Sequence, residues 1–151
     1  MSKKRIVRKK GPVVAKRVIH DGIQVASGLE KHMYIRLKEN NIRTIYEGET
    51  FTLIESFMFN EDCYERQSNG KGILKNTGGK KIQSMKYTPD FIGEGFIIEC
   101  KGRANESFPL RWKLFKKYVS ENLKGVTLYK PQNQKECDEV VELIKKQKNG
   151  F

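Results

Sequence analysis

An acid and a base separated by one residue, Glu99 and Lys101, follow a short apolar run in the sequence. Side chains alternate between the two faces of a strand, so a strand here would present both groups on one face. Asp90 lies before a glycine-containing turn at residues 93–95, and a hairpin at this turn would return its carboxylate to the side of Glu99. The spacing therefore predicts two carboxylates and an ammonium at one edge of a β-sheet.

These groups suit the hydrolysis of a phosphodiester. The reaction places negative charge on a pentavalent phosphorus centre, and a hard divalent cation offsets that charge. Magnesium takes oxygen ligands and retains several waters, so Asp90, Glu99 and the main-chain carbonyl of Cys100 would suffice to bind Mg2+ or Mn2+. Lys101, beside the metal, would orient or deprotonate the attacking water. The alternative is that Glu99 and Lys101 form an exposed ion pair on an edge strand.

Short motifs in the chain carry a resemblance to a known family. The letters TPDF at 88–91 and IECKG at 98–102 are similar to the core of the PD-(D/E)xK nuclease superfamily. Within that superfamily, the chain resembles the endonuclease I-type phage Holliday-junction resolvases and related phage nucleases. The letters SGLE at 27–30 resemble the first helix of those enzymes, and FPLRWKLF at 108–115 resembles the helix that follows their lysine. The resemblance covers roughly residues 20–130.

The resemblance implies a magnesium-dependent endodeoxyribonuclease, with DNA as its partner and with Asp90, Glu99 and Lys101 as catalytic residues. It also implies that Glu30 is a further catalytic acid, contacting the metal directly or through water. The alternative for Glu30 is a capping box, in which its side chain bonds back to the amide of Ser27. The implied fold is a restriction-endonuclease-like α/β core, in which a mixed β-sheet is flanked by helices.

The resemblance also bears on substrate and assembly. It implies selectivity for branched or junction DNA, and it implies a homodimer because both strands of a junction must be cut symmetrically. Two other functions stay open, since a fold does not determine a function. One is a non-catalytic DNA-binding or virion protein on the same fold. The other is a nuclease subunit active only within a larger complex, with a phage or recombination protein as its partner.

Basic residues are concentrated at the start of the chain. The formal net charge is +12, and residues 1–17 contain eight lysines and arginines and no acid. Such a block predicts a disordered arm that binds phosphates without reading sequence, and the alternative is a solubilising or localisation tail. The residues predicted to contact DNA are Lys3, Lys4, Arg5, Arg8, Lys9 and Lys10 in this arm, and Arg103, Arg111 and Lys113 downstream. The alternative for the downstream residues is a solvated basic helix face.

The composition also indicates a compartment. No run of 18 or more apolar residues occurs, and the charged opening lacks the apolar stretch of a secretory signal, so no membrane partner is expected. Three cysteines without CxxC spacing argue against a disulfide framework or a zinc site and favour a reducing compartment. We therefore expect a cytoplasmic protein, in the host cytoplasm if it is phage-encoded, with a virion location as the alternative.

Residues 18–151 are predicted to form one nuclease domain, whose core elements run helix, three strands, helix, strand, helix. A short strand pair at 17–25, with a turn at residues 21–22, precedes this core. The predicted helices span 27–40, 109–122 and 134–146, and the predicted strands span 42–46, 51–59, 85–91, 96–101 and 126–129. Residues 60–81 are polar and rich in glycine and lysine, which predicts a long hairpin or a flexible loop. Its lysines either reach a phosphate backbone or are simply solvated.

Overall fold

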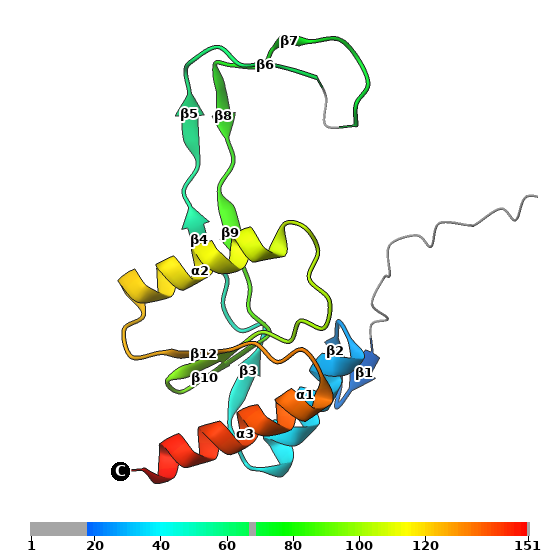
Figure 1. The fold of residues 1–151 in the computed structure, drawn as a ribbon, viewed down its shortest axis with the longest axis vertical. Helices are drawn as coiled ribbons and strands as arrows, with labels where there is room; N and C mark the ends of the chain where they lie inside the picture. Colours follow the sequence, from blue (N-terminus) through cyan, green and yellow to red (C-terminus); the bar gives the residue numbers. More distant parts are fainter. Residues whose placement is uncertain (1–17, 67–68, 151) are drawn as a thin grey trace, which may run out of the picture. The chain divides into compact units, whose positions relative to one another are not determined.

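The computed structural model describes residues 18–66 and 69–150. The predicted basic arm at 1–17, with its six proposed DNA-binding residues, lies outside the described residues. Two compact units are present (Figure 1). The first comprises the described residues up to Ile42, together with Cys100–Gly102 and the described residues from Pro131 onward. The second comprises the described residues of Arg43–Glu99, together with Arg103–Lys130.

The first unit contains a strand pair and two helices. Its elements are β1 (Val18–His20), β2 (Ile23–Val25), α1 (Gly28–Glu39) and α3 (Gln134–Asn149). The predicted turn between β1 and β2 is confirmed: Asp21 and Gly22 have φ values of 51° and 75°, the left-handed conformation that a tight two-residue turn requires. Both helices begin at a capping residue, since Ser27 accepts a hydrogen bond from the Glu30 amide and Asn133 accepts one from the Glu136 amide.

The core of the first unit lies between α1 and α3. Its buried side chains are Met33 and Leu37 from α1, and Cys137, Val140, Val141 and Ile144 from α3. A polar cluster joins the same two helices: Asp138 Oδ1 accepts a hydrogen bond from Arg36 Nε at 2.8 Å and lies 3.1 Å from His32 Nε2. Desolvation by itself raises the pKa of Asp138, but the hydrogen bonds from His32 and Arg36 outweigh it and hold that pKa below its usual range.

The second unit is built on a four-stranded mixed sheet in the order β12-β11-β10-β3. The strands are β3 (Thr44–Tyr46), β10 (Phe91–Gly93), β11 (Phe96–Ile98) and β12 (Thr127–Tyr129), and α2 (Phe108–Asn122) connects β11 to β12. Strand β10 is antiparallel to both β3 and β11, whereas β11 and β12 are parallel and therefore need a crossover connection. In the chain, α1 precedes β3, the strands β4 to β9 lie between β3 and β10, and α2, β12 and α3 follow β11 in that order. The mixed α/β class is confirmed.

Helix α2 packs one apolar stripe into the core of the second unit. Phe108, Trp112, Phe115 and Val119 recur at the spacing of one helix face, and all four are buried. They form one cluster with Ile97 of β11 and with two further buried rings, Phe51 and Tyr87. The Tyr87 and Phe115 rings have centroids 4.5 Å apart, so aromatic packing makes up much of this core.

One predicted strand, 85–91, is wrong as a single element. Strand β9 (Met85–Tyr87) pairs with β4 (Phe51–Ile54), and β10 begins only at Phe91, in the four-stranded sheet. Pro89 lies between them, and it has no amide hydrogen to donate to a ladder. The predicted strand 51–59 divides in the same way, into β4 and β5 (Phe57–Phe59), with two residues between them.

The predicted insertion at 60–81 is a long hairpin, and we refer to residues 57–82 as the β-arm. Within it β5 pairs with β8 (Lys80–Ile82), and β6 (Tyr64–Glu65) pairs with β7 (Lys75–Asn76). Figure 1 shows that β5 extends outward from β4 and that β8 extends outward from β9. Large apolar side chains are exposed along the β-arm, namely Phe57, Met58, Tyr64, Ile73, Leu74 and Ile82.

None of the helices in residues 18–66 and 69–150 is both long enough and apolar enough to cross a membrane.

Candidate active site

The two predicted carboxylates lie at the open end of the β10–β11 hairpin. Ile92 pairs with Ile97 and Phe91 pairs with Ile98, so the next step of the antiparallel register places Asp90 opposite Glu99. The turn is tight, with Gly95 in the left-handed region at φ 78°. The predicted hairpin therefore forms, and it places both acids at the same end of the second unit's sheet.

The main chain holds both acidic residues in the sheet. The Asp90 carbonyl accepts a hydrogen bond from the Glu47 amide at 2.8 Å, and the Glu99 amide donates to the Tyr129 carbonyl at 2.9 Å. The Glu99 side chain is buried, with 7% of its surface exposed, while Asp90 is half-buried. Because neighbouring strands fix both backbones, the two carboxylates have little freedom to move apart.

Tyr87 lies beside these two acids, and we refer to Asp90, Glu99 and Tyr87 as the acidic cluster. Sequence reasoning assigned no role to Tyr87. Burial first, and then the negative charge of the Glu99 carboxylate, raise the pKa of Tyr87, and the charge of Asp90 adds to this effect. Arg111 acts on Tyr87 in the opposite direction. Its Nη2 donates to the Lys86 carbonyl at 2.7 Å, which holds the guanidinium on this side of α2. The only sequence signal for Tyr87 is its place as the aromatic residue before Thr88-Pro89-Asp90.

The site therefore contains a buried carboxylate, Glu99, and a second carboxylate, Asp90, and both act electrostatically on Tyr87. Burial and like charge both disfavour the ionised state of such a pair, and a bound cation or a positive side chain offsets this cost. Oxygen donors are the ligands that hard divalent cations prefer. The donor set of Asp90 and Glu99 thus fits magnesium or manganese, with waters completing the coordination.

The remaining predicted catalytic residues, Cys100 and Lys101, come after β11 in the chain and belong to the first unit. The Lys101 amide donates to the Pro131 carbonyl at 3.0 Å. Cys100 is buried, and Lys101 is half-buried. The predicted strand 96–101 is shorter than expected, since β11 ends at Ile98.

Glu30 is a buried acid in the first turn of α1, with 5% of its surface exposed. Its Oε1 accepts a hydrogen bond from the Ser27 hydroxyl at 2.9 Å, and its Oε2 accepts one from the Ala26 amide at 3.1 Å. The Glu30 amide in turn donates to Ser27 Oγ at 3.2 Å. This is reciprocal capping of the kind proposed as the alternative role of Glu30. A metal-binding role for Glu30 stays a prediction.

Clusters of three or more potential metal ligands are absent from the described part of the chain. In residues 18–66 and 69–150, no group of three or more histidine, cysteine, aspartate or glutamate side chains is arranged to hold a metal ion. A magnesium site here would therefore use two carboxylates with waters or a main-chain carbonyl, a ligand set that this ion accepts.

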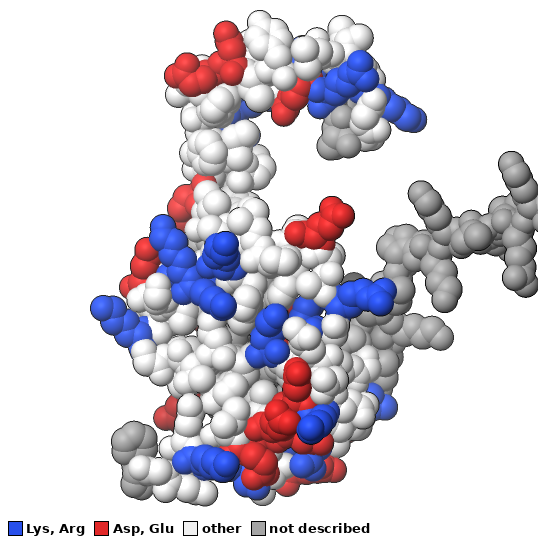
Figure 2. All heavy atoms as spheres, in the orientation of Figure 1, with Lys and Arg blue, Asp and Glu red and all other residues white. Residues whose placement is uncertain are grey.

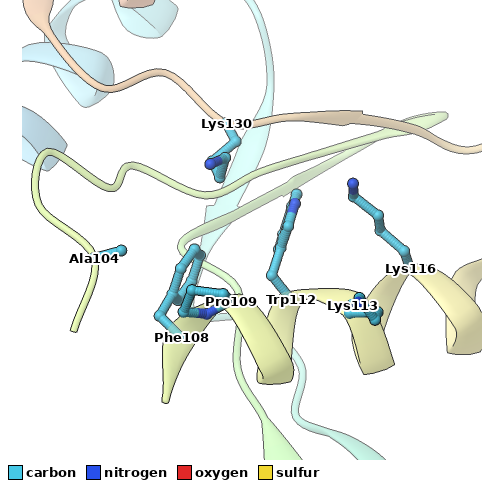
Figure 3. A pocket seen from close by; sticks show the side chains of 7 residues that line it. All are labelled: Ala104, Phe108, Pro109, Trp112, Lys113, Lys116 and Lys130. Carbon is cyan, nitrogen blue, oxygen red and sulfur yellow. The ribbon is translucent and has the colours of Figure 1, made fainter. Parts of the chain in front are cut away.

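Basic side chains gather over α2, as Figure 2 shows. Of the residues predicted to bind DNA, Arg103, Arg111 and Lys113 are all exposed. Lys113 also lines a hollow of about 220 Å³ together with Lys116 and Lys130 (Figure 3). Sequence reasoning missed Lys130, because it lies outside α2, directly after β12, and only the β11–α2–β12 crossover brings it beside α2.

The fold and the acidic hairpin define a mixed α/β protein with a candidate metal-binding carboxylate pair. The chain belongs to the family described as "Protein of unknown function (DUF1064)", whose model matches residues 10–135. No curated protein and no solved structure matches the chain.

Proposed function

We propose that this chain is a divalent-metal-dependent endodeoxyribonuclease with a restriction-endonuclease-like core of the PD-(D/E)xK kind. The observation that carries the proposal is the register of β10 and β11, which, continued by one residue, sets Asp90 opposite the buried Glu99. The motif sequences around both residues, and the order of helices and strands, agree with it. Branched or junction DNA as substrate, and a homodimeric phage resolvase as the biological form, are parts of the same proposal.

The proposed mechanism assigns one task to each group. A bound Mg2+ or Mn2+ would stabilise the negative charge that develops on the phosphate oxygens during cleavage. Asp90 and Glu99 would hold the ion, with the Cys100 carbonyl as a further oxygen donor. Lys101 would orient the attacking water or accept its proton. Arg111, which already acts electrostatically on Tyr87, would attract the scissile phosphate toward the site.

The direct test is a cleavage panel of linear, nicked, flapped and four-way DNA, with magnesium and with a chelator. Glu99→Gln keeps the side-chain shape and removes the charge. We expect it to lower the cleavage rate at least about a hundredfold, because the stabilisation of transition-state charge is lost. Glu94→Gln is the matched control, since Glu94 is an exposed acid in the turn of the same hairpin. Equal cleavage by the Glu99 variant and the wild type, in preparations free of other nucleases, would reject the proposal.

The β-arm favours a second candidate, a nuclease subunit that works only within a larger complex. Phe57 and Met58 are 47% and 53% exposed, and exposed apolar groups of this kind mark protein interaction surfaces. The test is to purify the full chain from its source cells, as the wild type and as the variant Phe57→Ser/Met58→Ser/Tyr64→Ser. A protein retained only by the wild type, which switches on cleavage when added back, would establish this function. Full activity of the isolated chain would exclude it.

A further inference from the structure

A hollow on α2 lies outside the acidic cluster, and its lining is unusual. It belongs entirely to the second unit and has a volume of about 220 Å³. Its lining residues are Ala104, Phe108, Pro109, Trp112, Lys113, Lys116 and Lys130. Figure 3 shows Phe108 and Trp112 projecting from α2 toward the strand end that carries Lys130. The lining thus combines an aromatic floor, formed by the small exposed parts of the otherwise buried Phe108 (5%) and Trp112 (7%), with three ammonium groups, and it contains no acid.

The aromatic floor is ordered by its own packing. The Phe108 and Trp112 rings are stacked, with centroids 6.0 Å apart and an interplanar angle of 18°. Lys130 Nζ lies 5.9 Å from the centroid of the Phe108 ring, within the range of a cation–π interaction. The ammonium of Lys130, which lines the hollow, therefore lies over the Phe108 ring.

The three lysines that line the hollow differ in their ion pairing from the neighbouring Lys117. Lys117, the next lysine along α2, forms an ion pair with Glu121, with 3.7 Å between Lys117 Nζ and Glu121 Oε1. Lys113, Lys116 and Lys130, by contrast, form no ion pair with any residue in the ranges that the structure describes. Three uncompensated ammonium groups around one hollow favour an anionic ligand.

The combined chemistry selects among anionic ligands. A bare phosphate would gain nothing from the aromatic floor, and a duplex hides the faces of its bases within the stack. An unpaired nucleotide offers a planar apolar base for the floor and a phosphate for the lysines, which is how proteins bind single strands. Ligand pockets usually measure roughly 300–1,000 Å³, so this smaller hollow suits one base rather than several.

We propose that this hollow receives one unpaired nucleotide of a nucleic-acid strand, with the base against the exposed parts of Phe108 and Trp112 and the phosphate among Lys113, Lys116 and Lys130. The inference rests on the proposed function only in taking nucleic acid as the partner. It specifies the substrate as one with a single-stranded segment, such as a branch, a flap or an opened junction.

Trp112 makes this site directly observable, because it is the one tryptophan in the chain. Its fluorescence is followed while the full chain is titrated with a single-stranded oligonucleotide, the corresponding blunt duplex, or inorganic phosphate. A chelator is present throughout, so no cleavage is involved. We expect a saturable change with the single strand, at about tenfold lower concentration than with the duplex, and a negligible change with phosphate.

The matched variants are Lys116→Glu/Lys130→Glu at the hollow and Lys117→Glu/Lys124→Glu on exposed positions outside it, which change the charge equally. The hollow variant should lose about tenfold or more in single-strand affinity, with a salt dependence shallower by roughly 0.7 for each lost phosphate contact. The control variant should lose less than half as much on a logarithmic scale. Circular dichroism establishes that both variants are folded.

The outcomes separate this inference from the nuclease proposal. Equal losses in the two variants, duplex binding as tight as single-strand binding, or an equal response to phosphate would each overturn it. A chain without cleavage activity that still shows the Trp112 response would leave the inference standing and count against the nuclease alone. If the chain cleaves DNA but its Trp112 fluorescence does not change on addition of the single-stranded oligonucleotide, the inference is rejected and the nuclease proposal is not.

Discussion

Two hairpins of the second unit have the same local structure and opposite surroundings. The β10–β11 hairpin lies between β3 and β12, and every residue of β11 is buried. The β-arm consists of two successive strand pairs, β5–β8 and β6–β7, and within the described residues neither pair is joined by a third strand. All residues of β6, β7 and β8 are exposed. In Figure 2 the surface along β5 and β8 of the β-arm consists mostly of uncharged residues. A two-stranded ribbon without a covered face is marginally stable in water, whereas a central hairpin is held by the whole sheet.

The difference in surroundings explains why a site with opposed carboxylates suits the β10–β11 hairpin and not the β-arm. Opposed carboxylates need a fixed spacing, and the flanked hairpin supplies it because its register is set by buried residues on both strands. The β-arm is instead held near its end by side-chain hydrogen bonds, such as those from the Cys63 and Gly78 amides to Asn76 Oδ1 at 3.1 and 2.9 Å. Such local bonds leave exposed side chains available for contact with a partner.

Truncating one residue of each hairpin, buried in the first and exposed in the second, tests this contrast most strongly. Phe91 of β10 has no exposed surface, so Phe91→Ala should lower the free energy of unfolding by about 3–5 kcal/mol. Met58→Ala, in the β-arm, removes an exposed side chain and should change it by less than about 0.5 kcal/mol. Urea unfolding at pH 7 measures both. Similar losses in the two variants would show that the β-arm is covered in the isolated chain.

Removing one acidic charge from each hairpin should lower the cleavage rate only for the hairpin that carries the proposed active site. Asp90→Asn should lower the cleavage rate at least about a hundredfold, since a proposed metal ligand is lost. Asp62→Asn removes the same charge from the exposed β-arm and should leave the rate within about twofold. Single-turnover cleavage at saturating magnesium is the measurement. Unimpaired cleavage by the Asp90 variant would remove Asp90 from the active site.

The tyrosines of the two regions should differ in alkaline solution. The pKa of Tyr87 is raised by burial and by Glu99, so above about pH 10 the unfolded chain loses this proton while the folded chain keeps it. Stability should then fall by about 1.4 kcal/mol per pH unit from this residue, and below pH 10 the contribution is constant. Tyr87→Phe should make the alkaline loss of stability shallower than in the wild type. Tyr64→Phe, an exposed control in the β-arm, should leave the pH dependence unaltered, and equal slopes in all three proteins would contradict the expectation.

The hairpin with its two acids was predictable because the necessary information is local. Alternation along 96–101 and a glycine turn are sufficient to place Asp90 opposite Glu99. The helix cap at Ser27 and the buried stripe of α2 are local patterns in the same sense, and both are confirmed. Glu30 shows the limit of such reasoning, since one pattern was compatible with two roles and the observed hydrogen bonds are those of the cap.

What could not be predicted depends on pairing between distant segments. Nothing in 85–91 alone shows that Tyr87 pairs with β4 while Phe91 joins another sheet, although Pro89 marks the point of division. The place of Tyr87 beside Glu99 follows from that division. The hollow likewise requires Lys130 to lie across from α2, which depends on the crossover and not on any short motif.

Shortening the β-arm should have the smallest effect and tests the contrast from the other side. Phe59 pairs with Lys80, so replacing residues 60–79 by Asn-Gly would close β5 and β8 with a two-residue turn in the observed register. The removed segment contains three basic and three acidic residues, so the net charge is unaltered. Because the flanked sheet folds on its own contacts, the free energy of unfolding should change by less than about 1 kcal/mol. The intrinsic cleavage rate on linear DNA should also stay within about twofold, because Asp90, Glu99 and Lys101 are untouched. Thermal unfolding and single-turnover cleavage measure these two quantities. A large loss of stability would mean that the β-arm is part of the folding core, and a loss of cleavage in a stable variant would assign the β-arm to the active complex.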